Sequence, residues 1–194
     1  MRQIECVMLA AGMSTRMGKW KMMLPYADST ILDNAIANAL GFCHRVILVG
    51  GFRGDELADR YCQQSQVQVV QNADYRSGMF SSIQTGVQYV RGKHFFLALG
   101  DMPCVSDWVY AALWQEKGEF TLIPRCYQGK GHPVLLPASI IPRIITAAPE
   151  ITMKQVIGQQ DYRFLDVGNQ AIHLDIDTPQ QYQQLRCPTT ALAG

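Results

Sequence analysis

A short apolar run that ends in a turn of small residues constrains this chain more than any other feature. The run covers Ile4–Leu9, and the stretch that follows, LAAGMSTRMGKWKMMLP, contains Gly12, Gly18 and three cations. Short apolar runs are typical of buried parallel strands. Small residues after such a strand let backbone N–H groups approach a phosphate closely. The sequence therefore predicts a central strand followed by a phosphate-binding loop.

Other apolar runs alternate with segments of helical periodicity. The predicted strands are Ile4–Leu9, Arg45–Val49, Val67–Val70, His94–Leu99, Phe120–Pro124, Pro133–Leu136, Tyr162–Val167 and Ile172–Ile176. Helices are predicted over Asp55–Gln63, Ile140–Ala147 and Thr152–Ile157. Others are predicted to begin after a cap at Ser29 or Thr30, at Ser77 or Gly78, after a cap at Ser106, and at Pro179. Such alternation implies parallel strands joined by right-handed crossovers. We predict an α/β fold with some antiparallel pairing in its less regular second half.

Composition limits the class of protein. The 194 residues are 48% apolar and 17% charged, with a net charge of +1, so we expect no nucleic-acid or membrane partner. Six cysteines form no C-x-x-C pair and no zinc pattern, which predicts free thiols in a reducing compartment. Neither a leader segment nor a run of ~20 apolar residues is present, and we expect a cytoplasmic location. We predict a single domain over residues 1–186, followed by a flexible tail over residues 187–194.

The loop after the first run matches neither of two common phosphate motifs. Five residues separate Gly12 from Gly18, and Trp20 stands where a P-loop has Ser or Thr. The dinucleotide fingerprint G-x-G-x-x-G is also absent. Arg16 and Lys21 could still neutralise charge that develops on a reacting phosphate. The alternative is a glycine-rich turn with solvated cations.

Carboxylates follow two of the predicted strands. Asp101 lies in a Gly-Asp-Met-Pro turn directly after His94–Leu99, where packing does not explain an acidic residue. Mg²⁺ commonly takes one or two carboxylates together with phosphate oxygens, so Asp101 is a candidate metal ligand, or else a turn or helix-cap residue. Asp175 and Asp177 alternate and would share a face of a strand, and either could be a second ligand. Asp177 could instead cap the helix that begins at Pro179.

His132 is the one histidine of four in a glycine-rich setting, Gly131-His132-Pro133. It could contact a substrate, or it could be a structural imidazole bonded to the backbone. The segments AAGMSTRMGK, GDMP and DIDTP lie at the carboxyl ends of predicted strands. Ligands of open α/β sheets bind at the carboxyl ends of the strands, so we expect these segments to share one site.

An ordered set of motifs resembles the molybdenum cofactor nucleotidyltransferases. The motifs are LAAG-x-S-x-RMG-x-x-K from Leu9, N-x-x-x-x-x-G-x-x-S-S from Asn72, then GDMP, GHPV and DIDTP. The resemblance extends from Ile4 to about Leu185. It implies a Rossmann-like, mostly parallel sheet flanked by helices, with a small mixed-strand extension.

The resemblance also implies an activity. CMP would pass from CTP to the terminal phosphate of the molybdenum cofactor, giving a dinucleotide form of the cofactor and pyrophosphate. Relatives that use GTP typically have LAGG where this chain has LAAG, so Ala11 favours CTP. The alternatives are the same chemistry with GTP or with another phosphorylated acceptor, and a non-catalytic carrier of the cofactor. A molybdoenzyme that receives the product is a possible partner.

The family's residue roles carry over to matching positions. Catalytic roles would fall to Arg16, Lys21 and Asp101, with Mg²⁺ on Asp101 and Asp177. The implied nucleotide-binding residues are Leu9, Ala10, Ala11, Gly12, Arg16, Lys21, Asn72, Gly78, Ser81 and Ser82. Gly131, His132 and Pro133 would face the pterin acceptor. Nucleotidyl transfer needs alignment, a metal and cations where charge develops, and a phosphate nucleophile needs no dedicated base.

Overall fold

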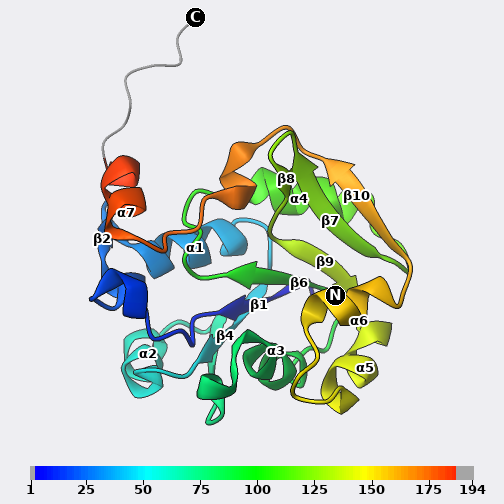
Figure 1. Ribbon diagram of the computed structural model, residues 1–194, viewed down its shortest axis with the longest axis horizontal. Coiled ribbons are helices and arrows are strands. Elements are labelled where there is room, and N and C mark those ends of the chain that lie inside the picture. The colour runs from blue at the N-terminus through cyan, green and yellow to red at the C-terminus, as the bar shows by residue number, and fades with distance from the viewer. Residues whose placement is uncertain (1–2, 187–194) are drawn as a thin grey trace, which may run out of the picture.

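A computed structural model describes residues 3–186, and its elements alternate along the chain as predicted (Figure 1). The strands are β1 (Glu5–Leu9), β2 (Pro25–Tyr26), β3 (Ser29–Thr30), β4 (Arg45–Gly50), β5 (Val67–Gln71), β6 (His94–Leu99), β7 (Thr121–Cys126), β8 (Gly129–Lys130), β9 (Val134–Pro137) and β10 (Tyr162–Asp166). The α-helices are α1 (Ile31–Leu40), α2 (Gly54–Tyr61), α3 (Met79–Val87), α4 (Asp107–Gln115), α5 (Ile141–Thr146), α6 (Met153–Gly158) and α7 (Pro179–Arg186). Short 3₁₀ turns are η1 (Thr15–Met17), η2 (Lys21–Met23), η3 (Tyr75–Ser77), η4 (Ala138–Ile140) and η5 (Gln170–His173). The predicted tail, residues 187–194, lies outside the described residues.

The central sheet is mostly parallel, which confirms the predicted fold class. Its strand order is β10-β7-β9-β6-β1-β4-β5, with β8 paired to β7. β1 lies between β4 and β6 and pairs in parallel with both. β9 runs antiparallel to β6 and β7, so the mixed region lies on the far side of β6 from β1, as expected for the second half. β1 is therefore an inner strand with at least two strands on either side, and the loop that follows it lies away from both edges of the sheet.

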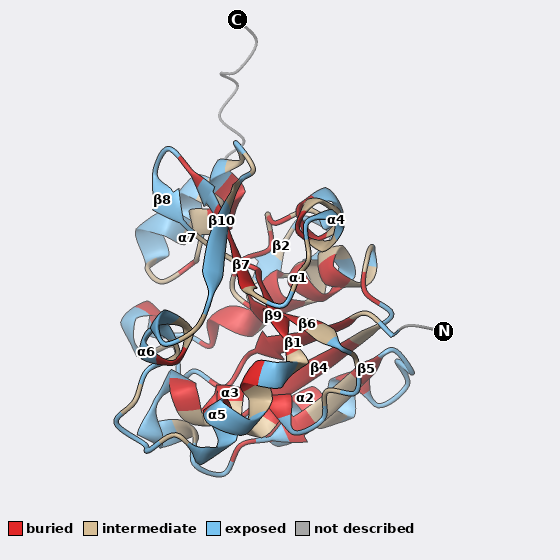
Figure 2. Cartoon of the chain, turned by 90° about the vertical axis from the view of Figure 1, so that its right-hand side faces the viewer, coloured by how far each residue is buried: buried red, intermediate tan, exposed pale blue. Residues whose placement is uncertain are grey.

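The two faces of the sheet carry two separate cores. Alternate residues of β1 point to opposite faces, so Cys6 and Met8 join one core while Val7 and Leu9 join the other. The helices α1, α2 and α4 cover the first face, and α3, α5 and α6 cover the second. The strands are buried between these layers, whereas β10 at the edge is mainly exposed (Figure 2).

Local chemistry explains where the first long helix begins. Thr30 accepts a hydrogen bond from the Asp33 N–H through Oγ1, at 3.1 Å, and the Asp33 carboxylate accepts one from the Thr30 N–H, at 3.3 Å. This capping box satisfies backbone donors of the first turn, so of the two predicted caps it is Thr30 that acts. Ser106 occupies the predicted position before α4, but its side chain makes no capping hydrogen bond.

The strand predicted over Ile172–Ile176 is wrong. The chain instead forms the 3₁₀ turn η5, because the Asn169 side chain accepts a hydrogen bond from the Ala171 N–H at 2.8 Å. Such Asn side chains favour turns over extended backbone. Ile172 is buried, and its carbonyl accepts a hydrogen bond from the His132 N–H at 3.0 Å. The argument that alternation puts Asp175 and Asp177 on one strand face therefore fails.

Two further observations concern the cysteines and the helices of the described residues. The five cysteines within residues 3–186 are free thiols, as predicted, and Cys187 lies outside that range. Within the same residues, no helix has both the length and the apolar character needed to cross a membrane.

Candidate active site

The loop after β1 is held in shape by its own side chains. The Lys21 N–H donates a hydrogen bond to Ser14 Oγ at 3.1 Å, which closes the loop between its two 3₁₀ turns. Ser14 and Gly18 both have positive φ, and glycine meets that requirement without strain. Trp20 is buried, with the Arg53 guanidinium 4.7 Å from the centroid of its ring. The loop is therefore a fixed structure that determines where its cations lie.

Lys21 lies between two carboxylates that are distant in the sequence. Its ammonium donates to Asp101 Oδ2 at 2.5 Å and to Asp177 Oδ1 at 2.7 Å. Arg16 pairs with the second oxygen of Asp177, at 2.6 Å. The Lys21 side chain is only 9% exposed, whereas that of Arg16 is 71% exposed. The predicted catalytic residues thus form one ion cluster, with Lys21 at its centre.

Backbone hydrogen bonds bring these segments together. The Gly100 N–H donates to the Leu9 carbonyl at 2.9 Å, which holds the turn after β6 against the end of β1. The Ile176 N–H donates to the Asp101 carbonyl at 3.2 Å, which holds the segment before α7 against that turn. Because both neighbours of Ile176 are aspartates, this one contact brings Asp175 and Asp177 to the cluster. The site is therefore built at the carboxyl ends of β1 and β6, as expected for this fold.

The charges of the cluster change its ionisation. Burial would raise the pKa of Asp177, but the hydrogen bonds and charges of Lys21 and Arg16 outweigh it and lower the pKa. Burial would likewise lower the pKa of Lys21, but Asp101 and Asp177 raise it. The pKa of Asp175 is raised by burial, with Asp177 and Asp101 adding repulsion. Lys21 is therefore held as a cation, whereas Asp175 takes a proton more readily than a free aspartate does.

Asp177 does not cap the last helix. That role belongs to Thr178, whose Oγ1 accepts a hydrogen bond from the Gln181 N–H at 3.2 Å. Gln181 Oε1 in turn accepts hydrogen bonds from the N–H groups of Asp177 and Thr178, each at 2.9 Å. The carboxylate of Asp177 is thus directed to the cations, and Asp101 lies in a turn well before α4.

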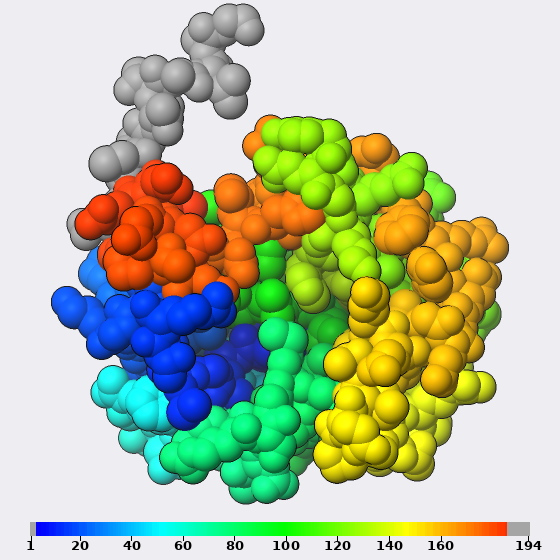
Figure 3. Space-filling view, in the orientation of Figure 1, coloured from blue at the N-terminus to red at the C-terminus, as the bar shows by residue number. Residues whose placement is uncertain are grey.

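A cavity of about 390 Å³ opens over the cluster. Figure 3 shows a hollow between the blue N-terminal loop, the orange segment before α7 and the green segment around residue 75. Many of the predicted residues line the cavity, namely Leu9, Ala11, Gly12, Arg16, Lys21, Gly78, Ser82, Asp101 and Asp177. Gly12 and Gly78 face open space, so a ligand can approach their backbone. The sequence and the geometry thus agree on most of the lining.

Three predicted nucleotide-binding residues lie behind the wall of this cavity. Ala10 is completely buried in the core under the loop. Asn72 is buried and donates hydrogen bonds to the hydroxyl oxygens of Ser81 and Ser82, each at 2.9 Å. Asn72 also accepts a hydrogen bond from the Asp74 N–H at 2.9 Å. Asn72 and Ser81 therefore tie the loop after β5 to the first turn of α3 and position Ser82.

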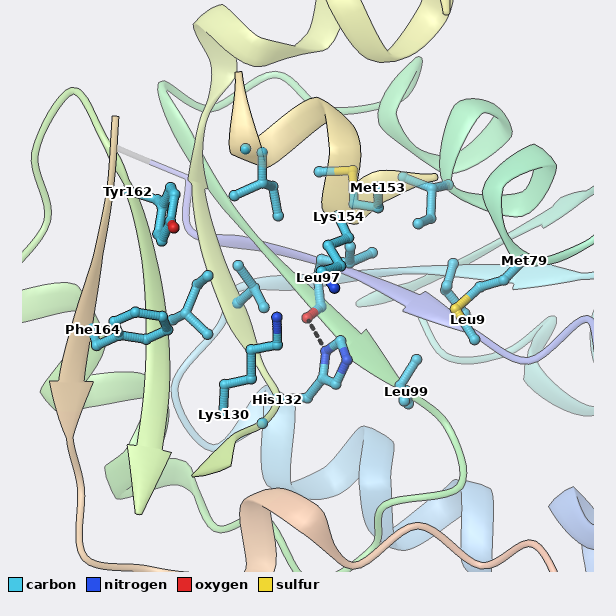
Figure 4. Close-up of a pocket in the computed structure, with 16 residues that line it drawn as sticks. Leu9, Met79, Leu97, Leu99, Lys130, His132, Met153, Lys154, Tyr162 and Phe164 are labelled. Carbon is cyan, nitrogen blue, oxygen red and sulfur yellow. Dashed lines mark hydrogen bonds between the residues drawn. The ribbon is translucent and has the colours of Figure 1, made fainter. Parts of the chain in front are cut away.

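A second cavity, of about 360 Å³, adjoins the first and shares Leu9, Met79 and Leu99 with it. Gly131 and His132 line it, whereas Pro133 is buried behind them. A Cβ on Gly131 would lie 2.2 Å from the Ile172 carbonyl oxygen, so no larger residue fits there. His132 Nδ1 lies 3.4 Å from the Leu97 carbonyl oxygen, and burial lowers the pKa of the imidazole (Figure 4). His132 is thus both a backbone-bonded side chain and part of the cavity wall.

Sequence reasoning missed several lining residues. Arg76 and Met79 line the first cavity, and the Arg76 guanidinium lies over the ring of Tyr75, another lining residue, at 4.8 Å. The available signal was their position next to Gly78, with Arg76 in the loop expected between Asn72 and Gly78 and Met79 directly after it. Lys130 and Lys154 line the second cavity and come from segments that had no predicted role.

The donor set fits a hard divalent cation that also binds phosphate. Asp101 Oδ1 is buried and has no hydrogen-bond partner in the described part of the chain, which leaves one oxygen ready for a ligand. No group of three or more His, Cys, Asp or Glu side chains within residues 3–186 is arranged to hold a metal by itself. Mg²⁺ usually takes only one or two carboxylates and completes its shell with phosphates and water.

The features above define a class of enzyme. A mostly parallel sheet, a fixed cationic loop after its central strand and carboxylates at the end of the neighbouring strand are the parts of a nucleotidyltransferase. The chain belongs to the family of MobA-like NTP transferase domains, which matches residues 6–163.

Individual relatives agree with this assignment. The chain is 39% identical over 182 residues to the molybdenum cofactor cytidylyltransferase of Escherichia coli strain K12, covering 94% of this chain and 95% of that protein. It is 22% identical to a probable molybdenum cofactor guanylyltransferase of Bacillus cereus strain AH820, over 92% of this chain and 93% of that one. Among solved structures, Rv0371c of Mycobacterium tuberculosis H37Rv superposes with a TM-score of 0.82, at 25% identity, over 95% and 97% of the two chains. A manganese complex of the same protein superposes with a TM-score of 0.78, at 25% identity, over 95% and 98% of the chains.

Proposed function

We propose that this protein transfers CMP from CTP to the molybdenum cofactor and releases pyrophosphate. The observation that carries the proposal is the Lys21 ammonium, held between Asp101 and Asp177 at the base of a nucleotide-sized cavity. The identity of 39% with a molybdenum cofactor cytidylyltransferase supports the choice of nucleotide and acceptor. We further propose that residues 1–186 act as one nucleotidyltransferase domain.

The chain's own cations would bind the triphosphate. Lys21 is rigid and nearly buried, so it suits a contact with the phosphorus centre under attack, where negative charge increases in the transition state. Arg16 is exposed at the mouth of the first cavity, so it would contact the part of the triphosphate that leaves as pyrophosphate. The acceptor phosphate is already ionised near neutral pH, so alignment matters more than proton removal.

Asp101 and Asp177 would hold the divalent metal, which we propose to be Mg²⁺. When bound, the metal would neutralise phosphate charge and orient the triphosphate. The free Oδ1 of Asp101 supports this role, and the Rv0371c structure with manganese shows that a protein of this fold takes a divalent ion. Asp175 lies beside both carboxylates, and its raised pKa makes it a poorer ligand than Asp177.

The base and ribose would lie over Leu9, Ala11 and Gly12, and the chain near Gly78 and Ser82 would form the opposite wall. These residues all line the first cavity. Ala10, Asn72 and Ser81 would act indirectly, by fixing the backbone beneath. The acceptor would enter the second cavity beside Gly131 and His132, with Pro133 supporting that turn.

The experiment is pyrophosphate release by the purified protein with molybdenum cofactor and each NTP in turn. We expect turnover with CTP and Mg²⁺, and loss of about 10²–10³ in kcat in Asp101→Asn. Asp107→Asn is the matched control, because Asp107 is exposed on the first turn of α4, away from the cavity. Turnover with GTP alone would contradict the CTP assignment. Tight binding of CTP and cofactor without pyrophosphate release would instead favour a carrier.

A further inference from the structure

The second cavity has mainly apolar walls, and two lysines also line it. Its surface is mainly apolar, with Leu97 and Leu99 from β6, Ile83 from α3 and Val134 from β9. Its outer part is formed by the aromatic pair Tyr162 and Phe164, whose ring centroids are 5.7 Å apart. Apolar and aromatic walls of this kind suit a flat ring system.

Two lysines enter this apolar space. Lys130 comes from β8 and Lys154 from α6, and both side chains reach toward the middle of the cavity near His132 (Figure 4). Neither ammonium has an ion-pair or hydrogen-bond partner among residues 3–186. Burial lowers the pKa of the nearby His132, so the lysines are the positive groups that the cavity presents. A ligand that fills the cavity therefore gains from carrying negative charge.

The nucleotide does not need these lysines. The first cavity already contains Arg16, Lys21 and Arg76, and neither Lys130 nor Lys154 lines it. The two cavities meet at Leu9, Met79 and Leu99, so one molecule can place its reacting phosphate at the ion cluster and its body in the second cavity. The lysines would then face a negative group of the acceptor other than its reacting phosphate.

Resting on the proposed function, we propose that Lys130 and Lys154 are acceptor-binding residues. They bind an anionic group carried by the flat ring system of the acceptor, while its reacting phosphate lies at the Lys21 cluster. The cavity thus selects acceptors with two separated negative groups. A phosphorylated molecule without the second group would lose the contacts with both lysines.

The test uses the whole protein with molybdenum cofactor as the acceptor and compares Lys130→Met, Lys154→Met and the double variant. We expect each single change to raise the KM for the cofactor about fivefold and the double change about twentyfold. The KM for CTP and kcat stay unchanged, because neither lysine touches the nucleotide. The KM for the cofactor should also become less sensitive to NaCl in the double variant. Lys130→Arg and Lys154→Arg keep the charge and should retain most of the affinity.

Lys93→Met is the matched control, because Lys93 is exposed at the opposite end of the sheet. An unchanged cofactor KM in the double variant, or an equal rise in the control, overturns the proposal. A fall in kcat also overturns it, since the lysines would then contact the reacting phosphate.

Cofactor binding is also measured without turnover, as molybdenum retained with the protein after ultrafiltration. Lysine-dependent retention without pyrophosphate release supports this proposal while contradicting the cytidylyltransferase activity. Absence of both retention and turnover in the unmodified protein overturns both.

Discussion

Replacing Lys21 by methionine removes the ammonium that lies between Asp101 and Asp177 and keeps a side chain of similar length. In the protein as it stands, those two carboxylates bind their own lysine, at 2.5 and 2.7 Å. A divalent metal that used the same carboxylates would meet this positive charge. The variant should therefore bind Mn²⁺ more tightly than the unmodified protein when no nucleotide is present.

The size of the effect follows from the charges. Two unit charges about 4 Å apart interact by about 4 kcal/mol at an effective dielectric constant of about 20, and a divalent ion doubles that energy. Asp177 is 21% exposed, so solvent screens part of the charge and only a fraction of the repulsion opposes binding. We expect affinity for Mn²⁺ to rise about tenfold to hundredfold in Lys21→Met.

Electron paramagnetic resonance of free Mn²⁺ measures this affinity directly, with and without CTP. Adding CTP should strengthen Mn²⁺ binding in the unmodified protein, because the triphosphate offers Lys21 another partner. Turnover should nevertheless fall about 10²–10³ in the variant, since the cation at the reacting phosphate is gone. Tighter metal binding with slower turnover is the combination that identifies Lys21 as both counter-ion and catalytic residue.

Lys19→Met controls for the charge of the loop, because Lys19 is exposed and lies two residues away. It should leave Mn²⁺ affinity within about twofold, given the weak energy of exposed charges. If Lys21→Met binds Mn²⁺ no more tightly than the unmodified protein, Lys21 does not compete with the metal. Equal gains in both variants would show that only the net charge of the loop matters.

Three other changes test the framework around the site. Glu5→Leu removes the buried carboxylate that pairs with Arg45 at the base of β1 and accepts hydrogen bonds from the Arg91 and Gly92 N–H groups, and it should lower the free energy of unfolding in urea by about 3–5 kcal/mol, with the KM for CTP unchanged. Asn72→Ala removes two buried hydrogen bonds to serines and should cost about 1–3 kcal/mol of stability while raising the KM for CTP. The pKa of Asp33 is raised by burial but lowered more by its hydrogen bonds, so its stabilisation is present above about pH 4 and lost as the pH falls below that value. The stability difference between Asp33→Asn and the unmodified protein should therefore shrink in acid.

The sequence predicted the parts of the site that follow strands. Leu9, Lys21 and Asp101 could be assigned to one edge because parallel strands end together, and the sheet confirms that β1 and β6 are neighbours. Glycines at open backbone positions, such as Gly12 and Gly78, could also be found from the sequence. Local sequence pattern and the topology of the sheet are enough to place these residues.

The remaining parts depend on packing between distant segments. Asp177 reaches the site through the hydrogen bond from Ile176 to Asp101, and not through the strand that was expected. No local pattern shows that Lys21 lies between two carboxylates, or that Asn72 faces the α3 serines and not the cavity. The second cavity is formed by α6 and β10 closing over β6, so the role of Lys154 had no signal in its own neighbourhood.

Ala11 is the residue on which the sequence argument for CTP over GTP rests, and in the structure it packs against two other loops. A Cβ on Gly51 would lie 2.5 Å from Tyr75 Cβ and 2.9 Å from Ala11 Cβ. The loops after β1, β4 and β5 therefore pack together at Gly51, where there is no room for a side chain. The Ala11 carbonyl also accepts a hydrogen bond from the Phe52 N–H at 3.2 Å. Ala11 is thus held in place by neighbouring loops on one side and lines the first cavity on the other. Because Ala11 also lines the first cavity, we propose that the choice of nucleotide depends on how these three loops pack around Gly51.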